Sequence, residues 1–286
     1  MFQINWKTKS YLYKIFEFFK LKKILYFVQK HITKRSLVHI AKVDKSWKFH
    51  ADSIKKYNVK NLLEVGAGKS LEQNIFFSYF FNNKIKQTVI DINKMLDLAL
   101  FNEANRSIAK ILNVNNKGNV NSLEELELKY NIFYKAPYSI SDVLKSKEVF
   151  DICVSTTTLE HFTKKDIDNL LSNLKKIIKK NGHVSSAIDY SDHYSHTDKN
   201  INTLNFLKYD ETEWQKYNNS FLYQNRLRHR DYEKIFNLHG YKIKDNIEGP
   251  RGEALTDLSR EYNPSDKSIL ILWGYYLIEN NLEVKI

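Results

Sequence analysis

Two glycine residues, Gly66 and Gly68, stand one position apart directly after a short apolar run over residues 60–65. A second apolar run begins about twenty residues later and ends at Asp91. Such a pattern is typical of a ligand site built from a strand, a tight glycine turn, a helix and a second strand. The acid at the end of the second strand holds a ribose. The spacing therefore predicts that this part of the chain binds an adenine-containing small molecule.

The residues after the glycine turn narrow the class of ligand. A nicotinamide-binding turn has a third glycine for close helix packing, but residues 69–72 are Lys-Ser-Leu-Glu. Lys69-Ser70 also lacks the four-residue spacing between the glycines of a P-loop. A phosphate cradle is thus disfavoured. No Tyr-x-x-x-Lys pair follows the fourth predicted strand, which counts against a nicotinamide-dependent reductase or epimerase, although that class stays as an alternative.

Histidine and aspartate side chains gather after two of the predicted strands. His161 follows a strong apolar run, and residues 189–198 contain three Asp and two His. An imidazole there can take a proton from a hydroxyl nucleophile, and a carboxylate can orient the ring. We expect His161, His193 or His196 to act as the base, with Asp189 orienting it. A plain surface loop and metal ligation by His and carboxylate are the alternatives, and the expected site is metal-free.

A polar and aromatic insertion, residues 190–229, interrupts the pattern of strands and helices. Arginine forks bind carboxylate or phosphate oxygens in a bidentate manner, so we expect two arginines of this insertion to hold an anionic group of the substrate. The alternative is simple charge flanking the next helix. The expected substrate contacts are Tyr190, Tyr194, Asn225, Arg226 and Arg228.

Short apolar runs alternate with helical patterns along most of the chain. The expected strands are residues 60–65, 87–92, 132–134, 149–155, 183–189, 241–247 and 268–278. The expected helices are residues 10–31, 44–57, 70–81, 94–112, 123–128, 164–180 and 231–239. This alternation predicts a doubly wound, Rossmann-like α/β sheet of seven mainly parallel strands, with ligands at the carboxyl ends of the strands.

The positive charge of the chain is concentrated near its start. The formal net charge is +12 over 286 residues, and residues 1–50 hold twelve Lys and Arg against two acids, which leaves +10 there and +2 elsewhere. This distribution argues against a nucleic-acid groove on the body of the protein. The single cysteine, Cys153, excludes an internal disulfide and a thiolate zinc site, and it indicates a reducing compartment.

Residues 1–46 are expected to form a basic helical extension, and residues 47–286 a single domain that carries the insertion. The apolar stretch Tyr11–Val28 is interrupted by four lysines, so it is too charged to span a membrane, and no signal-peptide cleavage site follows it. The lysines scatter around a helix, which favours docking onto the body or a partner protein over peripheral contact with anionic lipid. The expected location is the cytoplasm, with peripheral contact at the inner face of the membrane as the alternative.

The chain resembles the class I S-adenosylmethionine-dependent methyltransferases in Glu64-Val65-Gly66-Ala67-Gly68 and in Asp91. Residues 140–143 resemble the family segment whose acid contacts the adenine, and Leu159-Glu160-His161 resembles the end of its fourth strand. The resemblance spans residues 47–189 and, more loosely, 230–278; Ser70 departs from it by replacing a glycine. It implies S-adenosylmethionine as cofactor and S-adenosylhomocysteine as product, held by Glu64, Gly66, Ala67, Gly68, Ser70, Asp91, Ile92, Asp142, Val143 and Thr156.

The insertion carries a second, softer resemblance. The sequence of the insertion is similar to that of methyltransferases associated with bacterial surface-glycan assembly. The similarity lies in Asp192-His193-Tyr194-Ser195-His196, in residues 205–207, in Trp214 and in residues 225–228. This similarity implies methyl transfer to an oxygen of a surface-polysaccharide sugar, its nucleotide-linked precursor or a phosphorylated decoration. A non-enzymatic binding or assembly module that retains a nucleotide pocket is the alternative.

Overall fold

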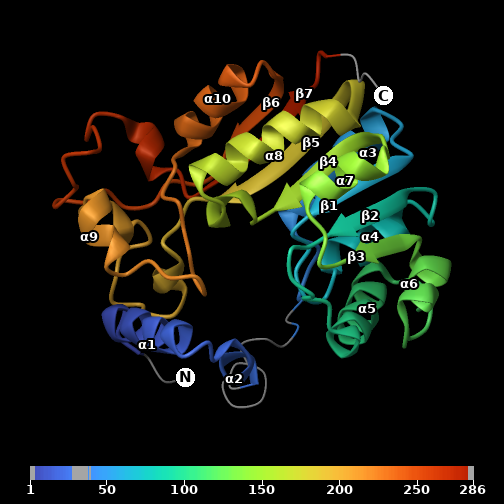
Figure 1. Cartoon of the computed structure of the whole chain (residues 1–286), viewed down its shortest axis with the longest axis horizontal. Coiled ribbons are helices and arrows are strands. Elements are labelled where there is room, and N and C mark those ends of the chain that lie inside the picture. Colours follow the sequence, from blue (N-terminus) through green and yellow to red (C-terminus); the bar gives the residue numbers. More distant parts are fainter. Residues whose placement is uncertain (1–3, 28–37, 39, 283–286) are drawn as a thin grey trace.

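A single seven-stranded sheet forms the centre of the computed structural model, which describes residues 4–27, 38 and 40–282 (Figure 1). The strands follow the order β3-β2-β1-β4-β5-β7-β6, and β7 runs antiparallel to both of its neighbours. The first five strands pair in parallel. Their bounds are β1 Asn61–Val65, β2 Lys86–Ile90, β3 Ile132–Lys135, β4 Phe150–Thr156, β5 Ile178–Asp189, β6 Lys242–Glu248 and β7 Trp273–Glu279.

Helices cover both faces of this sheet, as a doubly wound fold requires (Figure 1). The helices α3 Lys45–Lys56, α4 Glu72–Phe80, α5 Leu98–Leu112 and α6 Leu123–Tyr130 share one hydrophobic cluster with the sheet. The opposite face carries α7 Ile140–Ser146, α8 Lys164–Ile177 and α10 His229–Leu238. The predicted Rossmann-like α/β fold is confirmed.

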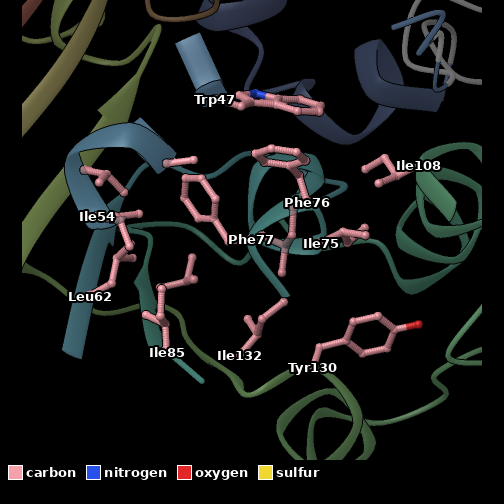
Figure 2. Packing of buried hydrophobic residues seen from close by; sticks show 14 of the residues in the cluster. Trp47, Ile54, Leu62, Ile75, Phe76, Phe77, Ile85, Ile108, Tyr130 and Ile132 are labelled. Atoms are coloured by element: carbon pink, nitrogen blue, oxygen red, sulfur yellow. The ribbon is translucent and has the colours of Figure 1, made fainter. Parts of the chain in front are cut away.

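Side-chain alternation along β1 explains how the strand serves both faces. Leu62 packs into the cluster under α3 and α4, whereas Leu63 packs into the cluster under α8. Figure 2 shows part of the first cluster, where the Trp47 ring lies against Phe76 with ring centroids 5.9 Å apart. A strand that is apolar on both faces belongs in the middle of a parallel sheet, and β1 lies there between β2 and β4.

Several boundaries differ from the predicted ones. Helix α8 ends at Ile177 instead of residue 180, because Ile178 is already extended and begins β5. The predicted strand 268–278 divides into a short 3-10 helix, η5 Lys267–Leu270, and β7. Helix α7 was not predicted; a capping box formed by Ser139 and Asp142 starts it.

The N-terminal segment forms two helices where one was predicted over residues 10–31. These are α1 Trp6–Phe18 and α2 Lys22–Phe27; residues 28–31 of the prediction lie outside the described residues. Helix α1 lies beside the insertion (Figure 1), which contains η3 His193–His196, η4 Asn205–Lys208 and α9 Glu211–Gln215. Extension and insertion thus share one hydrophobic core of Trp6, Tyr194, Leu204, Phe206, Leu207 and Trp214.

Hydrogen bonds fix the position of α1 against the insertion. The backbone N–H of Trp6 donates to Asp198 Oδ2 at 2.9 Å, and Ser10 Oγ donates to the carbonyl of Tyr217 at 2.7 Å. Trp6 itself is buried. Within residues 4–27, 38 and 40–282, no helix has the length and apolar character that a membrane crossing requires.

Candidate functional site

Three hollows adjoin one another at the carboxyl ends of the central strands. The order of the strands reverses between β1 and β4, and a crevice at such a reversal is where α/β sheets bind ligands. The Asp91 hollow, of about 320 Å³, is lined by Val65, Gly66, Ile90, Asp91, Ile92, Tyr138, Ser139, Ile140, Ser141, His161, Phe162, Asp166, Asn169 and Leu170. A further hollow of about 400 Å³, lined by Ile54 and Phe80 among others, contains none of the predicted site residues.

The other two hollows continue the crevice past the glycine turn. The Gly68 hollow, of about 290 Å³, shares Gly66 with the Asp91 hollow and is lined by Trp47, Glu64, Gly66, Ala67, Gly68, Lys69, Ser70, Glu72, Gln73, Thr156 and Thr157. The Asp189 hollow, of about 470 Å³, is lined by Asp44, Ser46, Trp47, Glu72, Thr156, Thr157, Asp189, Ser191, Thr203, Leu272 and Trp273. An elongated molecule therefore has a continuous series of surfaces to contact.

The two glycines of the turn have different structural roles. Both have positive φ, +79° at Gly66 and +74° at Gly68, which other residues adopt at a cost. A Cβ atom at Gly66 would lie 2.6 Å from Cγ2 of Thr158, so Gly66 is required for packing between the turn after β1 and the segment after β4. A Cβ atom at Gly68 would meet nothing within 4 Å. Gly68 therefore presents bare backbone to open space, as a ligand-binding turn does.

Glu64 is buried beneath the turn and is held by two amides of α4. Gln73 Nε2 donates to Oε1 at 3.1 Å, and Asn74 Nδ2 donates to Oε2 at 2.6 Å. Burial raises the pKa of Glu64 to about 7, an effect that the two amides partly offset. The carboxyl group lines the Gly68 hollow, but its known partners are the amides of α4.

A chain of hydrogen bonds connects Glu64 to His50 of α3. Thr156 Oγ1 donates to Gln73 Oε1 at 2.7 Å, so it must accept the proton of His50 Nε2, 3.0 Å away. His50 Nδ1 is then the acceptor for Ser185 Oγ at 2.6 Å. Burial lowers the pKa of His50 to about 3, so this ring is neutral at physiological pH. The chain holds Thr156, a predicted site residue, at the wall of two hollows.

Asp91 directly follows β2 and lines the hollow named after it. Burial raises the pKa of its carboxyl group to about 7, and the Tyr134 hydroxyl, 3.5 Å from Oδ2, offsets this only in part. The described chain thus leaves hydrogen-bonding capacity on this carboxylate for hydroxyl donors of a ligand. Ile92, with a side chain that is 73% exposed, lines the same hollow next to it.

The predicted histidines and Asp189 do come together in space. His193 Nε2 lies 3.4 Å from Asp189 Oδ2, and His196 Nε2 lies 3.8 Å from the same oxygen. The His161 ring is 5.0 Å from the His193 ring, measured between centroids. Ser191 donates to Asp189 Oδ1 from both its backbone N–H and its hydroxyl, at 2.8 and 2.6 Å, which fixes the orientation of the carboxylate.

Glu160 belongs to the same cluster, although the sequence did not single it out as a site residue. The residue is 2% exposed, and neither carboxylate oxygen makes a hydrogen bond of normal geometry with a described residue. Burial raises the pKa of Glu160 well above its usual range, and the backbone N–H groups of Glu160 and Asp189 offset this only in part. A buried acid without a partner is costly for a fold and indicates a ligand or a catalytic role.

The two arginines of the insertion do not face the crevice, which corrects the prediction that they bind an anionic group. Arg228 is 2% exposed, and it donates to the carbonyls of Tyr190, Ile269 and Ile271 at 2.5 to 3.0 Å. Arg226 is 5% exposed and donates to the Tyr209 carbonyl and to Glu211. Their guanidinium groups are already occupied by the fold.

The predicted acceptor contacts Tyr190, Tyr194 and Asn225 are also structural. Both tyrosines are 1% exposed; the Tyr190 hydroxyl is hydrogen-bonded to His229, and the Tyr194 hydroxyl donates to the Tyr217 carbonyl. Asn225 Nδ2 donates to the carbonyls of Leu159 and Phe162 at 2.8 and 2.9 Å. Asn225 therefore positions the short 3-10 helix η2 Leu159–His161 instead of contacting the acceptor.

Two further predicted cofactor contacts require correction. Asp142 accepts from the backbone N–H and the hydroxyl of Ser139 in the capping box of α7, and it does not line the Asp91 hollow. Val143 is completely buried. The adjacent Ser141 lines the hollow in their place. Ser70 lines the Gly68 hollow, and its hydroxyl donates to Glu72 Oε1 at 2.8 Å.

No family model matches the chain, and no curated protein matches it. Among solved structures, TehB from Haemophilus influenzae aligns over 88% of this chain and 65% of its own, with 13% identity and a TM-score of 0.44. An S-adenosylmethionine-dependent methyltransferase from Clostridium acetobutylicum aligns over 91% and 98%, with 14% identity and a TM-score of 0.47. A 1,6-didemethyltoxoflavin-N1-methyltransferase from Burkholderia thailandensis, solved with S-adenosylhomocysteine, aligns over 82% and 78%, with 11% identity and a TM-score of 0.47.

What is shared is the fold. Identities of 11–14% and TM-scores below 0.5 do not transfer an activity or a ligand to this chain. The site is therefore interpreted from its own residues: a bare glycine turn, a carboxylate with free acceptor capacity after β2, and a cluster of His, Asp and Glu where the crevice continues.

Proposed function

We propose that this protein is an S-adenosylmethionine-dependent methyltransferase that acts on an oxygen of a sugar. The observation that carries the proposal is the position of Gly68 and Asp91 at the ends of β1 and β2, each facing one of two hollows that meet at Gly66. Gly68 leaves room for a ligand backbone, and Asp91 can accept hydrogen bonds from two ribose hydroxyls. The sequence resemblance to class I methyltransferases supports the same assignment.

The residues of each hollow suit one part of this cofactor. Asp91 would hold the ribose, and Ile92, Ile140 and Leu170 offer apolar surface for the adenine. The methionine part would lie along the turn at Ala67 and Gly68, above the carboxyl group of Glu64. Neither hollow contains a third glycine or an arginine for a pyrophosphate, which favours a phosphate-free cofactor over a dinucleotide.

S-Adenosylmethionine supplies a methyl group on a positively charged sulfur, and the residues of the chain would align the acceptor and remove its proton. His193 and His196, paired with Asp189, and His161 are the candidate bases. Burial lowers the pKa of His161 and of His196, which keeps both rings neutral and able to accept a proton near pH 7. Alignment of donor and acceptor contributes several kcal/mol of such a rate enhancement.

The Asp189 hollow favours an uncharged sugar over a phosphorylated group. Its lining includes the carboxylates of Asp44, Glu72 and Asp189 together with the rings of Trp47 and Trp273. Carboxylates accept hydrogen bonds from sugar hydroxyls, and indole rings pack against apolar sugar faces, whereas three acids repel a phosphate. A surface-polysaccharide sugar, free or nucleotide-linked with its phosphates outside the hollow, is the acceptor class we propose.

Formation of S-adenosylhomocysteine tests this proposal. The full-length protein is incubated with S-adenosylmethionine and a panel of nucleotide-linked and free sugars, with the Asp91→Asn variant as control. We expect acceptor-dependent S-adenosylhomocysteine with at least one uncharged sugar and loss of most of this activity in the variant. Cofactor binding without turnover on any acceptor would favour the non-enzymatic binding module.

We also propose that the outer face of α1 and α2 contacts an anionic lipid surface. Phe18, Phe19 and Ile24 are 81%, 62% and 51% exposed, while the inner face of α1 packs on the insertion. Residues 1–50 carry the net charge of +10 derived above. Exposed aromatic and aliphatic side chains next to lysines are typical of helices that lie on membranes.

A further inference from the structure

Three potential metal ligands from two segments converge beside the crevice. Ligand atoms of Glu160, His161 and His193 all lie within 4.8 Å of one another. Glu160 and His161 belong to η2 after β4, and His193 begins η3 after β5. We infer that these three residues form a binding site for a divalent transition-metal ion. The sequence favoured a metal-free site, and the geometry points to the opposite conclusion.

The environment of Glu160 is the strongest evidence for a bound cation. Glu160 is 2% exposed, and neither oxygen has a hydrogen-bond partner of normal geometry among the described residues; only the backbone N–H groups of Glu160 and Asp189 act on it. Among the ion pairs of the described residues, none involves Glu160, and the partners of the adjacent Asp189 are His193 and His196. Two carboxylates next to each other without a permanent cation would repel, and a bound metal ion would compensate both.

The second ligand, His161, has the tautomer that metal binding requires. Its Nδ1 atom lies 2.7 Å from the carbonyl oxygen of Tyr223. A carbonyl only accepts, so Nδ1 carries the proton and Nε2 of the neutral ring carries a lone pair. Metal-binding histidines commonly donate their other ring N–H to a backbone carbonyl in this manner. Asn225 supports the arrangement by donating to both ends of η2.

His193 supplies the third ligand with its Nε2 atom. This nitrogen is buried and has no hydrogen-bond partner among the described residues. Its distance of 3.4 Å from Asp189 Oδ2 is longer than a normal N–H···O bond, so the two groups are neighbours without a strong mutual contact. Gln224 anchors this segment by accepting from the backbone N–H of His193 at 3.2 Å and by donating to the Ser191 carbonyl.

The donor set indicates the class of metal. Two neutral imidazoles and one carboxylate suit Zn²⁺, Co²⁺, Fe²⁺ and Mn²⁺ better than Mg²⁺ or Ca²⁺, which prefer oxygen ligands alone. At bond lengths of about 2.1 Å, tetrahedral ligands lie about 3.4 Å apart, so the three groups need only small rotations to close on an ion. Three protein ligands leave at least one coordination position open.

The location of the metal site beside the crevice suggests which group fills the open coordination position of the ion. This part of the inference rests on the proposed function. His161 lines the Asp91 hollow, and Asp189 next to His193 lines the hollow proposed for the acceptor. A sugar hydroxyl bound to the ion would lose its proton more readily. The proton passes to His196 or solvent, the oxygen bonds to the methyl carbon, and the carbon–sulfur bond breaks with its electron pair left on sulfur.

Metal binding is tested on the chelator-treated, full-length protein by calorimetry with Zn²⁺ and by visible absorption with Co²⁺. We expect one ion per chain and an absorption band of a low-coordinate cobalt site. Glu160→Gln and His161→Gln should each weaken Zn²⁺ binding by at least about 100-fold, a larger loss than outer-shell changes cause. His239→Gln is the matched control, because His239 pairs with Asp168 at 2.9 Å outside this cluster and should leave binding unchanged.

Unfolding temperatures separate loss of a ligand from loss of the fold. Without metal, Glu160→Gln should be at least as stable as the wild type, because it removes a buried acid whose ionised form the fold does not compensate. Added Zn²⁺ should raise the unfolding temperature of the wild type and not that of Glu160→Gln. Part of His161 reaches solvent even though its ring is partly desolvated, so its variant keeps the test informative if Glu160→Gln does not fold.

Three results would overturn the inference: no stoichiometric Zn²⁺ or Co²⁺ in the wild type, binding to Glu160→Gln and His161→Gln as tight as to the wild type, or binding abolished only by His196→Gln. The last result would place the ion on the surface at His196 and Asp189. Titration of all variants with S-adenosylmethionine in the absence of metal reports on the cofactor site alone. Failure of the metal site is thus distinguishable from failure of the proposed methyl transfer.

Discussion

At the scale of single residues, Asp91 must be ionised to hold the ribose hydroxyls as proposed. Burial raises the pKa of this carboxyl group to about 7. The ionised form dominates above that pH and accepts hydrogen bonds, so affinity for S-adenosylmethionine should fall as the pH drops below 7. We expect binding about tenfold weaker at pH 6 than at pH 8 by calorimetry, the ratio that a single protonation gives.

Glu64 provides a check on this assignment, because burial raises its pKa to about 7 as well. The Asp91→Asn variant retains Glu64. Any change of S-adenosylmethionine affinity with pH that remains in this variant therefore comes from Glu64 or another group and not from Asp91. If the variant shows the same tenfold dependence as the wild type, Asp91 is not the titrating contact.

The two glycines of the turn should respond differently to substitution. Gly68→Ala imposes a positive φ on alanine, which costs about 1–2 kcal/mol of unfolding free energy. Gly66→Ala carries the same strain and also brings a Cβ atom to 2.6 Å from Thr158, so it should cost about 2–4 kcal/mol. Urea unfolding measures both values.

The extra loss of stability in Gly66→Ala is attributed to a clash with Thr158, which is tested by adding Thr158→Ala to each glycine variant. It removes the two atoms of Thr158 closest to the new Cβ and should restore part of the stability of Gly66→Ala, with no such effect on Gly68→Ala. Equal losses in the two single variants would contradict the packing role of Gly66. Gly68 faces open space in the crevice. Gly68→Ala should therefore lower the affinity for S-adenosylmethionine more than Gly66→Ala does, relative to the unfolding free energy that each variant loses.

At the scale of elements, Arg228 joins three parts of the chain that the sequence gives no reason to associate. Its guanidinium donates to a carbonyl just after β5, to one within η5 and to one just after η5. Lysine cannot satisfy these acceptors, so we expect Arg228→Lys to lower the unfolding free energy by about 3 kcal/mol. Arg230→Lys is the matched control: its side chain is 61% exposed, and the change should stay below about 0.5 kcal/mol.

Affinity for cofactor and acceptor distinguishes this structural role of Arg228 from the predicted role of binding an anionic group of the substrate. The Arg228→Lys protein that remains folded should bind S-adenosylmethionine and acceptor as the wild type does. A variant that is fully stable but has lost acceptor affinity would show that Arg228 binds substrate after all.

The elements proposed to bind the cofactor can be predicted from the sequence because their pattern is local. Gly66, Gly68 and Asp91 lie at ends of short apolar strands, where periodicity and spacing predict both the fold and the site. Arg226 and Arg228 were misplaced because burial depends on carbonyls from segments distant in the chain, which no local pattern indicates. Glu160 was overlooked for the same reason: its isolation is a property of the surrounding fold.

At the scale of the whole molecule, the uneven charge supports the proposed contact with anionic lipid. We expect sedimentation with vesicles of anionic lipid and weaker binding to neutral vesicles, with a loss as salt screens the lysines. Phe18→Ser together with Phe19→Ser should reduce this binding several-fold without unfolding the protein, since both rings are exposed. Vesicle binding unchanged by the double variant would contradict the lipid contact, and concentration-dependent self-association lost in the variant would indicate a second copy as the partner.

The crevice at the ends of β1 and β2 is proposed to bind S-adenosylmethionine. The most direct measurement is a calorimetric titration of the full-length protein with S-adenosylmethionine and, separately, with NADH, repeated on Asp91→Ala. We expect micromolar binding of S-adenosylmethionine, no binding of NADH, and at least a tenfold loss of affinity for S-adenosylmethionine in the variant. Binding of NADH alone, or affinity for S-adenosylmethionine that is unchanged in Asp91→Ala, would contradict it.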